Sequence, residues 1–528
     1  MKINYKISKY LITGLLVFLF ASCEEDFLEK NPLDSTSSQN FWNSEEDVET
    51  VLVGVYSRLK ENYLGYERVY YDALTDNAWA DPSNINQQNI NYMTTGSISP
   101  ALGGAIKNMY SSPYRVITAC NFFLDNVDKA KDLFEEEELD VYKAEVRFIR
   151  ALAYFDLVQL YGDVIIYRNY FKTLDDAKIA KSPKADVYAF IEEDLNFAIS
   201  ILPDTKYKGH AVKGSAQGLL GRVLLTQEKW ADAAAVLKQV IDSAEVKKTF
   251  DLSDSYKDLF LTAGQKKATV NREIMFSTRY LAPNDVHRLK PGAAGMNIEL
   301  GWWLLLQPYS DLADSYQMAD GLPASESPIY DPTNDSTRYV NRDPRLDMTM
   351  QLPGEIWKDG SGNDWIEVRY LNPTGFKMEK YVDLSLAPFT NATASVTDQD
   401  MIHLRYADIL LMYAEAQNEA TGPDASVYSA LDRVRGRAGV NMPPVDQSRY
   451  NTRESLREFI RDERRVELAL EGLRYFDMKR WKIAHIKLPT MKTADGTQMV
   501  FEQKNYYLPF SQSELNSNPN LVQTDVWQ

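Results

Sequence analysis

The sequence predicts a mainly α protein in which paired helices form a scaffold, packed against a loop-rich half with few short strands. Apolar residues recur at helical spacing through residues of about 106–243 and 401–484. In the first of these stretches, successive helices read as antiparallel pairs. Between them, over residues of about 244–400, helical periodicity mostly fails and Pro, Gly, Asp and Trp are frequent. Because a long structureless segment is rare in a compact domain, we expect this region to pack on the helices.

The N-terminus, residues 1–22, has the composition of a secretory signal peptide, with three lysines ahead of an apolar core from Leu11 to Ala21. That core has about half of the roughly 20 residues that a spanning helix needs, so it is not expected to anchor the chain. It ends in Phe20-Ala21-Ser22-Cys23, which resembles a lipobox, and Cys23 is therefore the predicted lipidation site. The alternative is an ordinary signal peptide followed by a chance cysteine. Residues 23–40 are expected to be a lipid-anchored tether.

The charge and cysteine content restrict the partners and the stabilising forces. The net charge is −17, and it becomes −20 when the three lysines of residues 1–22 are removed. Nucleic acid and anionic membrane surfaces are therefore poor partners, whereas neutral polysaccharides suit the chain better. If Cys23 is acylated, Cys120 remains alone and no internal disulfide is expected. Stability must then come from burial of the core.

The helical scaffold can be followed in chain order. Ser44 is predicted to cap a helix that carries apolar residues at three-and-four spacing up to Leu59, and Pro113 is expected to bend the next helix, from Ile106. Residues 215–242 fit one tetratricopeptide repeat, a helix pair of about 34 residues. Upstream, residues 145–162 and 184–203 fit the two helices of another. A generic helical bundle is the alternative, and either makes this half a scaffold. The segment REIMFSTRY, from Arg272, suggests a short strand.

Three further helices are predicted near the C-terminus, over residues 401–420, 426–439 and 456–481, the last capped by Asn451 with Glu454 reaching back. The last helix carries many opposite charges at close spacing. Ion pairs that hold the helix to its neighbours are favoured over an anion site. The charged residues are Arg461, Glu463, Arg464, Arg465, Glu467, Glu471 and Arg474.

The run ERRVELALEGLRYFDMKRW, with RYADILLMYAEAQNEA and VRGRAG before it, closely resembles the C-terminal signature of the SusD/RagB family. These are surface glycan-binding lipoproteins of Bacteroidetes. Residues 27–59 and 506–523 are also SusD-like, so the resemblance covers nearly all of the mature chain. It implies a single SusD-like domain over residues 41–528, with the region of about 244–400 facing the ligand. Glu24-Glu25-Asp26 resembles the acidic signal that sends such lipoproteins to the cell surface.

The resemblance implies that the protein captures oligo- or polysaccharide at the outer membrane and delivers it to a SusC-like TonB-dependent transporter. The first alternative is a helical-repeat scaffold that binds peptide or protein partners, and the second is a secreted hydrolase. An enzyme is not expected, because no catalytic motif singles out a pair of residues. No cofactor or metal is expected either, since His403 reads as a packing residue and the acidic stretch from Asp331 to Asp335 lacks a calcium-loop consensus.

A glycan site needs exposed aromatic rings for the C–H faces of sugars, flanked by polar groups for their hydroxyls. Trp79 is one candidate, in a polar loop that matches the place where SusD-like proteins often put ligand residues. Trp302 and Trp303 are adjacent, so that in an extended chain one faces outward while the other packs. For each candidate the alternative is a buried loop anchor, and Trp42, Trp230 and Trp481 are assigned to packing. The predicted ligand-binding residues are Asp76, Asn77, Trp79, Asp81, Trp302, Trp303 and, more weakly, Trp357 and Trp365.

Overall fold

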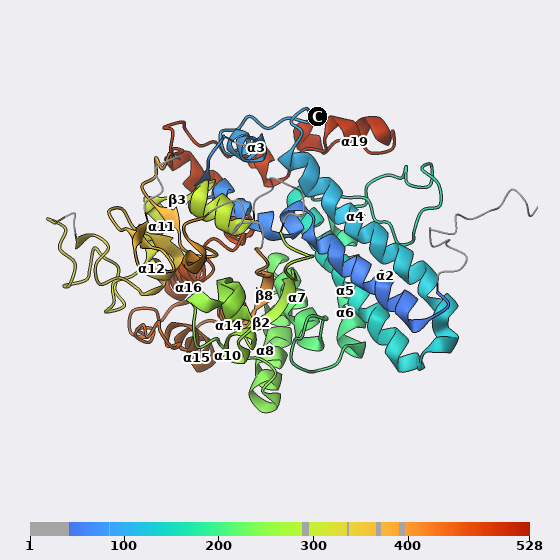
Figure 1. The fold of residues 1–528 in the computed structure, drawn as a ribbon, viewed down its shortest axis with the longest axis horizontal. Helices are drawn as coiled ribbons and strands as arrows, with labels where there is room; N and C mark the ends of the chain where they lie inside the picture. The colour runs from blue at the N-terminus through green and yellow to red at the C-terminus, as the bar shows by residue number, and fades with distance from the viewer. Residues whose placement is uncertain (1–41, 84, 288–294, 335–336, 366–370, 390–396) are drawn as a thin grey trace, which may run out of the picture.

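The computed structural model describes residues 42–83, 85–287, 295–334, 337–365, 371–389 and 397–528. Helices dominate one side of the molecule and loops with short strands the other (Figure 1). The long helices are α2 (Glu45–Ser57), α3 (Ile85–Thr94), α4 (Ala105–Asn126), α5 (Glu136–Tyr161), α6 (Lys184–Ile201), α7 (Lys213–Thr226), α8 (Trp230–Lys247), α14 (Tyr406–Thr421), α15 (Ala425–Arg435) and α16 (Arg453–Glu467). Shorter ones are α9 (Thr262–Gln265), α10 (Ala268–Asn271), α11 (Ser310–Ser315), α12 (Arg345–Thr349), α17 (Arg474–Arg480), α18 (Ala484–Lys487) and α19 (Gln512–Ser517).

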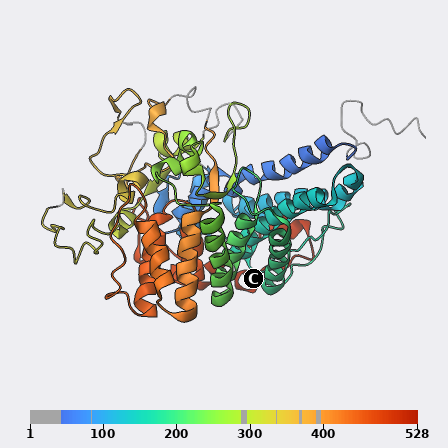
Figure 2. The same cartoon turned by 90° about the horizontal axis from the view of Figure 1, so that it is seen from below.

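The predicted helix pairs stack into one row, as expected for a tetratricopeptide-like scaffold (Figure 2). Helix α5 packs on α6, α6 on α7, α7 on α8, and α8 on α14, which in turn contacts α15 and α16. Two glycines of α7 allow this close packing. A Cβ atom at Gly218 would lie 2.8 Å from Ile409 Cδ1 of α14, and one at Gly221 would lie within 3.0 Å of the Leu237 side chain of α8. Larger residues at these two positions would force the neighbouring helices apart.

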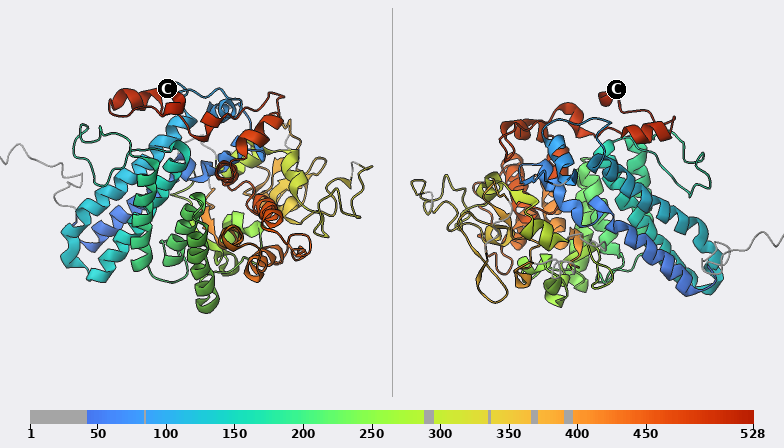
Figure 3. Two further views of the ribbon diagram at one scale, coloured as in Figure 1. Left: turned by 180° about the vertical axis from the view of Figure 1, so that it is seen from behind. Right: turned by 45° about the horizontal axis from the view of Figure 1, so that its top comes forward.

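The N-terminal helices confirm the capping prediction. Ser44 accepts a hydrogen bond from the Asp47 N–H and the Asp47 side chain accepts one from the Ser44 N–H, so α2 begins with a capping box. Helix α2 then packs alongside α4 and α5 (Figure 3). Pro113 lies inside α4, which is a single helix from Ala105 to Asn126. No helix in the described chain is long and apolar enough to cross a membrane.

The described strands form four antiparallel pairs. Strand β2 (Ile274–Thr278), predicted from REIMFSTRY, pairs with β8 (Met401–Arg405). The other pairs are β1 (Ala78–Ala80) with β3 (Leu306–Pro308), β4 (Met350–Gln351) with β7 (Lys377–Met378), and β5 (Trp357–Lys358) with β6 (Asp364–Trp365). Residues 401–405 were expected to be helical. They form a strand because all five are buried against β2, and this pairing outweighs the local helical pattern.

The helix predicted over residues 456–481 is interrupted, which corrects the prediction. Helix α16 ends at Glu467 and α17 begins at Arg474. In the turn between them Gly472 has φ of +75°, and a Cβ atom there would lie within 3.0 Å of the Arg68 carbonyl oxygen. The Gly472 N–H donates to Asp72 Oδ2 at 2.6 Å. The N-terminal cap also differs, because Thr452 pairs with Ser455 in place of Asn451 with Glu454.

The polar stretch around Trp79, expected to be a loop, is mostly buried over residues 70–83 and 87–99. It contains the end of the 3-10 helix η4 (Tyr66–Leu74), strand β1 and helix α3. Residues 70–80 are all buried. One continuous hydrophobic core joins these elements to the helical row, from Val48 in α2 to Leu521 near the C-terminus. The loop-rich half and the helical half therefore share their core.

Candidate functional site

A cluster of buried ion pairs fixes the loop-rich half to the helical scaffold. The carboxylate of Glu467, at the end of α16, contacts three guanidinium groups at 2.7–2.9 Å, those of Arg345, Arg405 and Arg437. Burial opposes ionisation of Glu467, but these guanidinium groups outweigh it and hold its pKa well below the usual value. The full cluster is Glu273, Asp343, Arg345, Lys380, Arg405, Arg435, Arg437, Glu463, Glu467 and Glu471.

This buried ion-pair cluster confirms the structural interpretation of the charged C-terminal helix. Arg345 and Lys380 come from the loop-rich half, and Glu463 and Glu471 come from α16 and the turn after it. Each glutamate already contacts a cation at 2.7–3.0 Å. The cations that could bind an incoming anion are therefore buried and already paired with carboxylates. The cluster acts as a rigid support for the loops above it.

Asp76 and Asn77 belong to a further set of buried polar contacts, which corrects their assignment to the ligand. The Asp76 carboxylate contacts Arg474 at 2.9 Å and Arg465 at 3.2 Å. Burial raises the pKa of Asp76, but the two guanidinium groups outweigh this effect and hold it well below its usual value. Asn77 donates to Asp72 Oδ1 and accepts from Arg465 Nε. Both side chains are fully buried, so neither offers a free group to a ligand.

Trp79 is also buried, with 4% of its surface exposed, so the expected accessible indole face is absent. It lies in β1 opposite Gln307 of β3. Asp81 follows the strand, is half-buried, and accepts a hydrogen bond from the Ser83 N–H at 2.8 Å. Its ligand role stays a prediction. The polar composition predicts an exposed loop, whereas Asp76 and Asn77 find their partners inside the protein.

Trp302 and Trp303 remain partly exposed. They end the π-helix η7 (Asn297–Trp302), and both pack on Ile298. The backbone at Trp303 is helical, with φ of −81° and ψ of −12°. The expectation of opposite faces on an extended chain is therefore wrong, because successive side chains of a helix turn by roughly a quarter of a circle. Both indoles thus lie at the surface of the loop-rich half.

Trp357 and Trp365 face each other across the β5–β6 hairpin. Their rings are stacked, with centroids 5.4 Å apart and planes inclined by 5°. Trp357 is buried and its Nε1–H donates to Glu379 Oε2 at 2.7 Å. Trp365 is partly exposed and meets the edge of Phe389 at 5.0 Å. The first tryptophan therefore anchors the hairpin, and the second presents ring surface.

Residues 381–389 bring the two tryptophan pairs to one region. Phe389 and Val382 pack against Gly301, where a Cβ atom would lie 2.8 Å from each. The Asp383 N–H donates to Asn297 Oδ1 at 2.7 Å, which ties this segment to η7. We call Trp302, Trp303, Trp357 and Trp365 the indole cluster. Phe389 and Gly301 connect it. The contribution of Phe389 was missed because Phe389 lies far from both tryptophan pairs in the sequence.

The remaining predicted positions are consistent with packing or lie outside the described residues. Trp42 and Trp481 are buried and Trp230 packs on the core, as expected. His403 is buried in β8 and its Nε2 lies 2.8 Å from Thr278 Oγ1, as expected for a packing residue. Cys23 lies in the part of the chain that is not described, so its lipidation stays a prediction. In the described ranges, no group of three or more His, Cys, Asp or Glu could hold a metal ion.

Two family models match the chain. The model described as "SusD family" matches residues 263–527, and the model described as "Starch-binding associating with outer membrane" matches residues 26–225. Together they cover the indole cluster and most of the helical row, with α8 in the gap between the two matched ranges.

Individual proteins agree with the family models over nearly the whole length. The chain is 26% identical to SusD-like protein P25 of Formosa agariphila, over 99% of both chains. It is 25% identical to a SusD-like protein of Bacteroides ovatus, over 90% of this chain and 82% of the relative. Among solved structures, a SusD-like carbohydrate binding protein from Bacteroides fragilis is 28% identical with a TM-score of 0.75, over 91% of this chain and 100% of that one.

Proposed function

Because the chain belongs to the SusD family, we propose that it is a surface protein of the outer membrane that captures oligo- or polysaccharide for a SusC-like TonB-dependent transporter. SusD-like proteins are carbohydrate-binding proteins and not enzymes. The solved relative from Bacteroides fragilis is described as carbohydrate binding. The net charge of −17 supports a neutral ligand over an anionic one.

The indole cluster is the observation that carries this proposal. Trp302, Trp303 and Trp365 are partly exposed and come from two segments that both pack on residues 381–389. A sugar ring presents a face of C–H groups that packs on an indole, and its hydroxyls bond to polar groups at the ring edge. Two polar residues lie beside the cluster. The Asp383 N–H donates to Asn297 Oδ1 of η7, and Lys377 Nζ lies 4.8 Å from the centroid of the Trp357 ring. The region therefore combines flat apolar surfaces with polar neighbours.

Lipid anchoring at Cys23 and delivery to a transporter complete the proposal. The lipobox-like residues before Cys23 and the acidic residues after it support an anchored, outward-facing protein. Attached acyl chains hold a protein firmly once there are two or more, since each buried methylene contributes about 0.8 kcal/mol. The anchor keeps the loop-rich half close to the outer-membrane transporter that takes up the glycan.

The test compares Trp303→Ala and Trp365→Ala, singly and together, with the wild-type protein. Binding of soluble polysaccharides is measured by affinity electrophoresis and calorimetry, with unrelated peptides as a second ligand panel and product release followed in parallel. Each substitution should lower glycan affinity about tenfold, as stacking on one ring contributes roughly 1–2 kcal/mol.

Trp527→Ala is the matched control, because Trp527 is also partly exposed but lies at the C-terminus. Its Nε1–H donates to the Tyr507 carbonyl oxygen. This variant should bind glycan as the wild type does. Unchanged affinity in the double variant would place the site elsewhere. Binding of peptides alone would support the scaffold alternative, and release of shortened glycan would support a hydrolase.

A further inference from the structure

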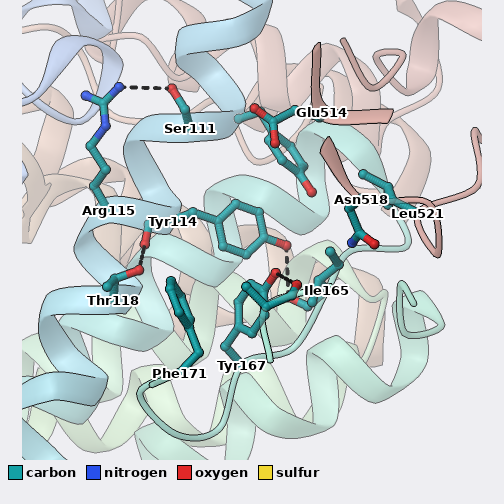
Figure 4. Close-up of a pocket in the computed structure, with 12 residues that line it drawn as sticks. Ser111, Tyr114, Arg115, Thr118, Ile165, Tyr167, Phe171, Glu514, Asn518 and Leu521 are labelled. Atoms are coloured by element: carbon teal, nitrogen blue, oxygen red, sulfur yellow. Dashed lines mark hydrogen bonds between the residues drawn. The ribbon is translucent and has the colours of Figure 1, made fainter. Parts of the chain in front are cut away.

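A second concave site lies on the helical half, between α4, the segment that follows α5, and the C-terminal helix α19 (Figure 4). Its volume is about 230 Å³. Tyrosine and phenylalanine rings form most of its wall, and polar side chains stand at its rim. The aromatic residues are Tyr110, Tyr114, Tyr167 and Phe171, and the polar ones are Ser111, Arg115, Thr118, Glu514 and Asn518. We call this concavity the tyrosine pocket.

Glu514 is the unusual group of the tyrosine pocket. It is half-buried, and burial raises the pKa of its carboxyl against the opposing effect of Lys107. Within the described chain this carboxylate accepts no hydrogen bond and forms no ion pair, although most of the protein's buried carboxylates are paired. Arg115 does not form an ion pair with Glu514, because Arg115 Nη1 lies 2.6 Å from Glu61 Oε2. A half-buried acceptor without a donor favours a ligand that brings donors.

A row of rings leads out of the tyrosine pocket along α4. Tyr110 and Tyr114 have centroids 4.8 Å apart, Tyr114 and Tyr167 5.6 Å, and Tyr167 and Phe171 5.7 Å. The row then continues from Phe171 through Tyr170, 5.7 Å away, to Phe122 at 5.3 Å.

A second cavity of about 390 Å³ adjoins the pocket along this row. It shares Arg115 and Thr118 with the pocket and is also lined by Phe122 and Tyr170. Ser111, Arg115, Thr118 and Phe122 follow one another on α4 at spacings of four, three and four residues. They therefore lie on one face of the helix, so the two cavities run along a single groove.

We propose that the tyrosine pocket and the adjoining cavity form a second binding site for a neutral glycan chain, which rests on the proposed function. One sugar ring packs on Tyr114 in the pocket, its hydroxyls donate to Glu514, and the next sugars lie against Phe122 and Tyr170. An acidic sugar is disfavoured in the pocket, because Glu514 is a carboxylate of its lining and Arg115, the cation that lines it, already contacts Glu61.

This site is separate from the indole cluster. It is built from α4, α19 and residues 165–177, whereas the indole cluster is built from residues 297–303, 357–365 and 381–389. In Figure 1, α4 and α19 lie on the opposite side of the molecule from β3 and α12. Two sites on one protein would hold a long polysaccharide by both ends of a segment, which raises overall affinity without any new contact.

The experiment measures the stoichiometry and affinity of neutral oligosaccharides by calorimetry, with maltohexaose, laminarihexaose, xylohexaose and mannohexaose as probes. We expect the wild-type protein to bind two molecules of the recognised probe per chain. The double variant Glu514→Ala/Tyr170→Ala should bind one, with at least about a tenfold loss at the second site, because a hydrogen bond to a charged group and a stacking ring are both removed. Tyr170 is 38% exposed, so this variant should fold normally.

Gln512→Ala is the matched control, since Gln512 is an exposed residue of α19 that does not line the pocket. A second readout does not depend on the pocket variant. The probe should slow amide hydrogen exchange in residues 165–177 of both the wild type and the Trp303→Ala/Trp365→Ala variant. One site per chain, with affinity unchanged in the pocket variant, would overturn this inference alone. No binding of any probe or polysaccharide would overturn the proposed function together with it.

Discussion

Asp76 gives the sharpest test of what the buried polar residues of this protein do, because a ligand role and a supporting role predict opposite results. Asp76→Asn keeps the shape of the side chain but removes the charge that faces Arg465 and Arg474. Arg465 retains other partners, with Asp311 at 2.8 Å and the Asn77 side chain at 3.0 Å. For Arg474, Asp76 is the carboxylate partner within 4 Å in the described chain. The variant thus leaves a buried guanidinium group poorly compensated.

The expected cost follows from this arrangement. Removing one partner of a buried ion pair destabilises a protein by about 3–5 kcal/mol, because the remaining charge stays buried. We expect Asp76→Asn to lower the free energy of unfolding by about that amount, measured by urea denaturation at pH 7. Asp81→Asn is the control, because Asp81 is half-buried and accepts one hydrogen bond, from Ser83. It should change the free energy of unfolding by less than about 1 kcal/mol.

The pH dependence follows from the lowered pKa of Asp76. A carboxyl whose pKa is lower in the folded than in the unfolded protein adds stability at pH values above its unfolded pKa. The contribution is lost as the pH falls from that value, near 3.8, towards the lower folded value. The difference between wild type and Asp76→Asn should therefore be full at pH 7 and shrink below about pH 4. An unchanged free energy of unfolding, with glycan binding lost in the folded variant, would refute the supporting role.

Four further outcomes are expected. Trp79→Ala should destabilise the protein by about 3–5 kcal/mol in urea, as large core truncations do, and a stable variant would show that the ring is not packed as described. Gly472→Ala should also be destabilising, by at least about 1 kcal/mol, since φ is +75° and its Cβ would meet the Arg68 carbonyl; an unaffected urea midpoint would contradict this geometry. Cys23→Ala should release the protein from membranes into the soluble fraction, and retention of the variant in membranes would count against the lipid anchor. Affinity purification of the anchored protein should recover one large barrel protein, and the absence of such a partner after crosslinking would count against the transporter.

The scaffold could be predicted from the sequence because its helices carry their own pattern. The apolar spacing that buries α5, α7, α8 and α14 is local, and so are the Ser44 cap of α2 and the β-branched residues of β2. The break after α16 was missed, although Gly472 inside an otherwise helical run was an available signal. Strand β8 was missed because its partner β2 lies more than 100 residues away in sequence.

The candidate site was predicted less well because exposure depends on distant partners. Asp76 and Trp79 look like surface loop residues, and only the position of Arg465 and Arg474, almost 400 residues later, makes this loop an interior one. In the same way Phe389 joins Trp365 to Gly301 of η7, and no pattern in the sequence predicts this contact. For the adjacent pair Trp302 and Trp303 one outward-facing indole was expected, whereas both are partly exposed on a helical backbone that was not foreseen.

A structure of the protein with a bound oligosaccharide tests the central claim most directly. The probe is the hexasaccharide that calorimetry shows to bind, soaked into crystals or added before crystallisation. The account predicts a sugar ring packed on Trp302, Trp303 or Trp365, with its hydroxyls bonded to neighbouring polar groups of the loop-rich half. A glycan bound at high occupancy elsewhere, with all three of these indoles uncovered, would contradict the account.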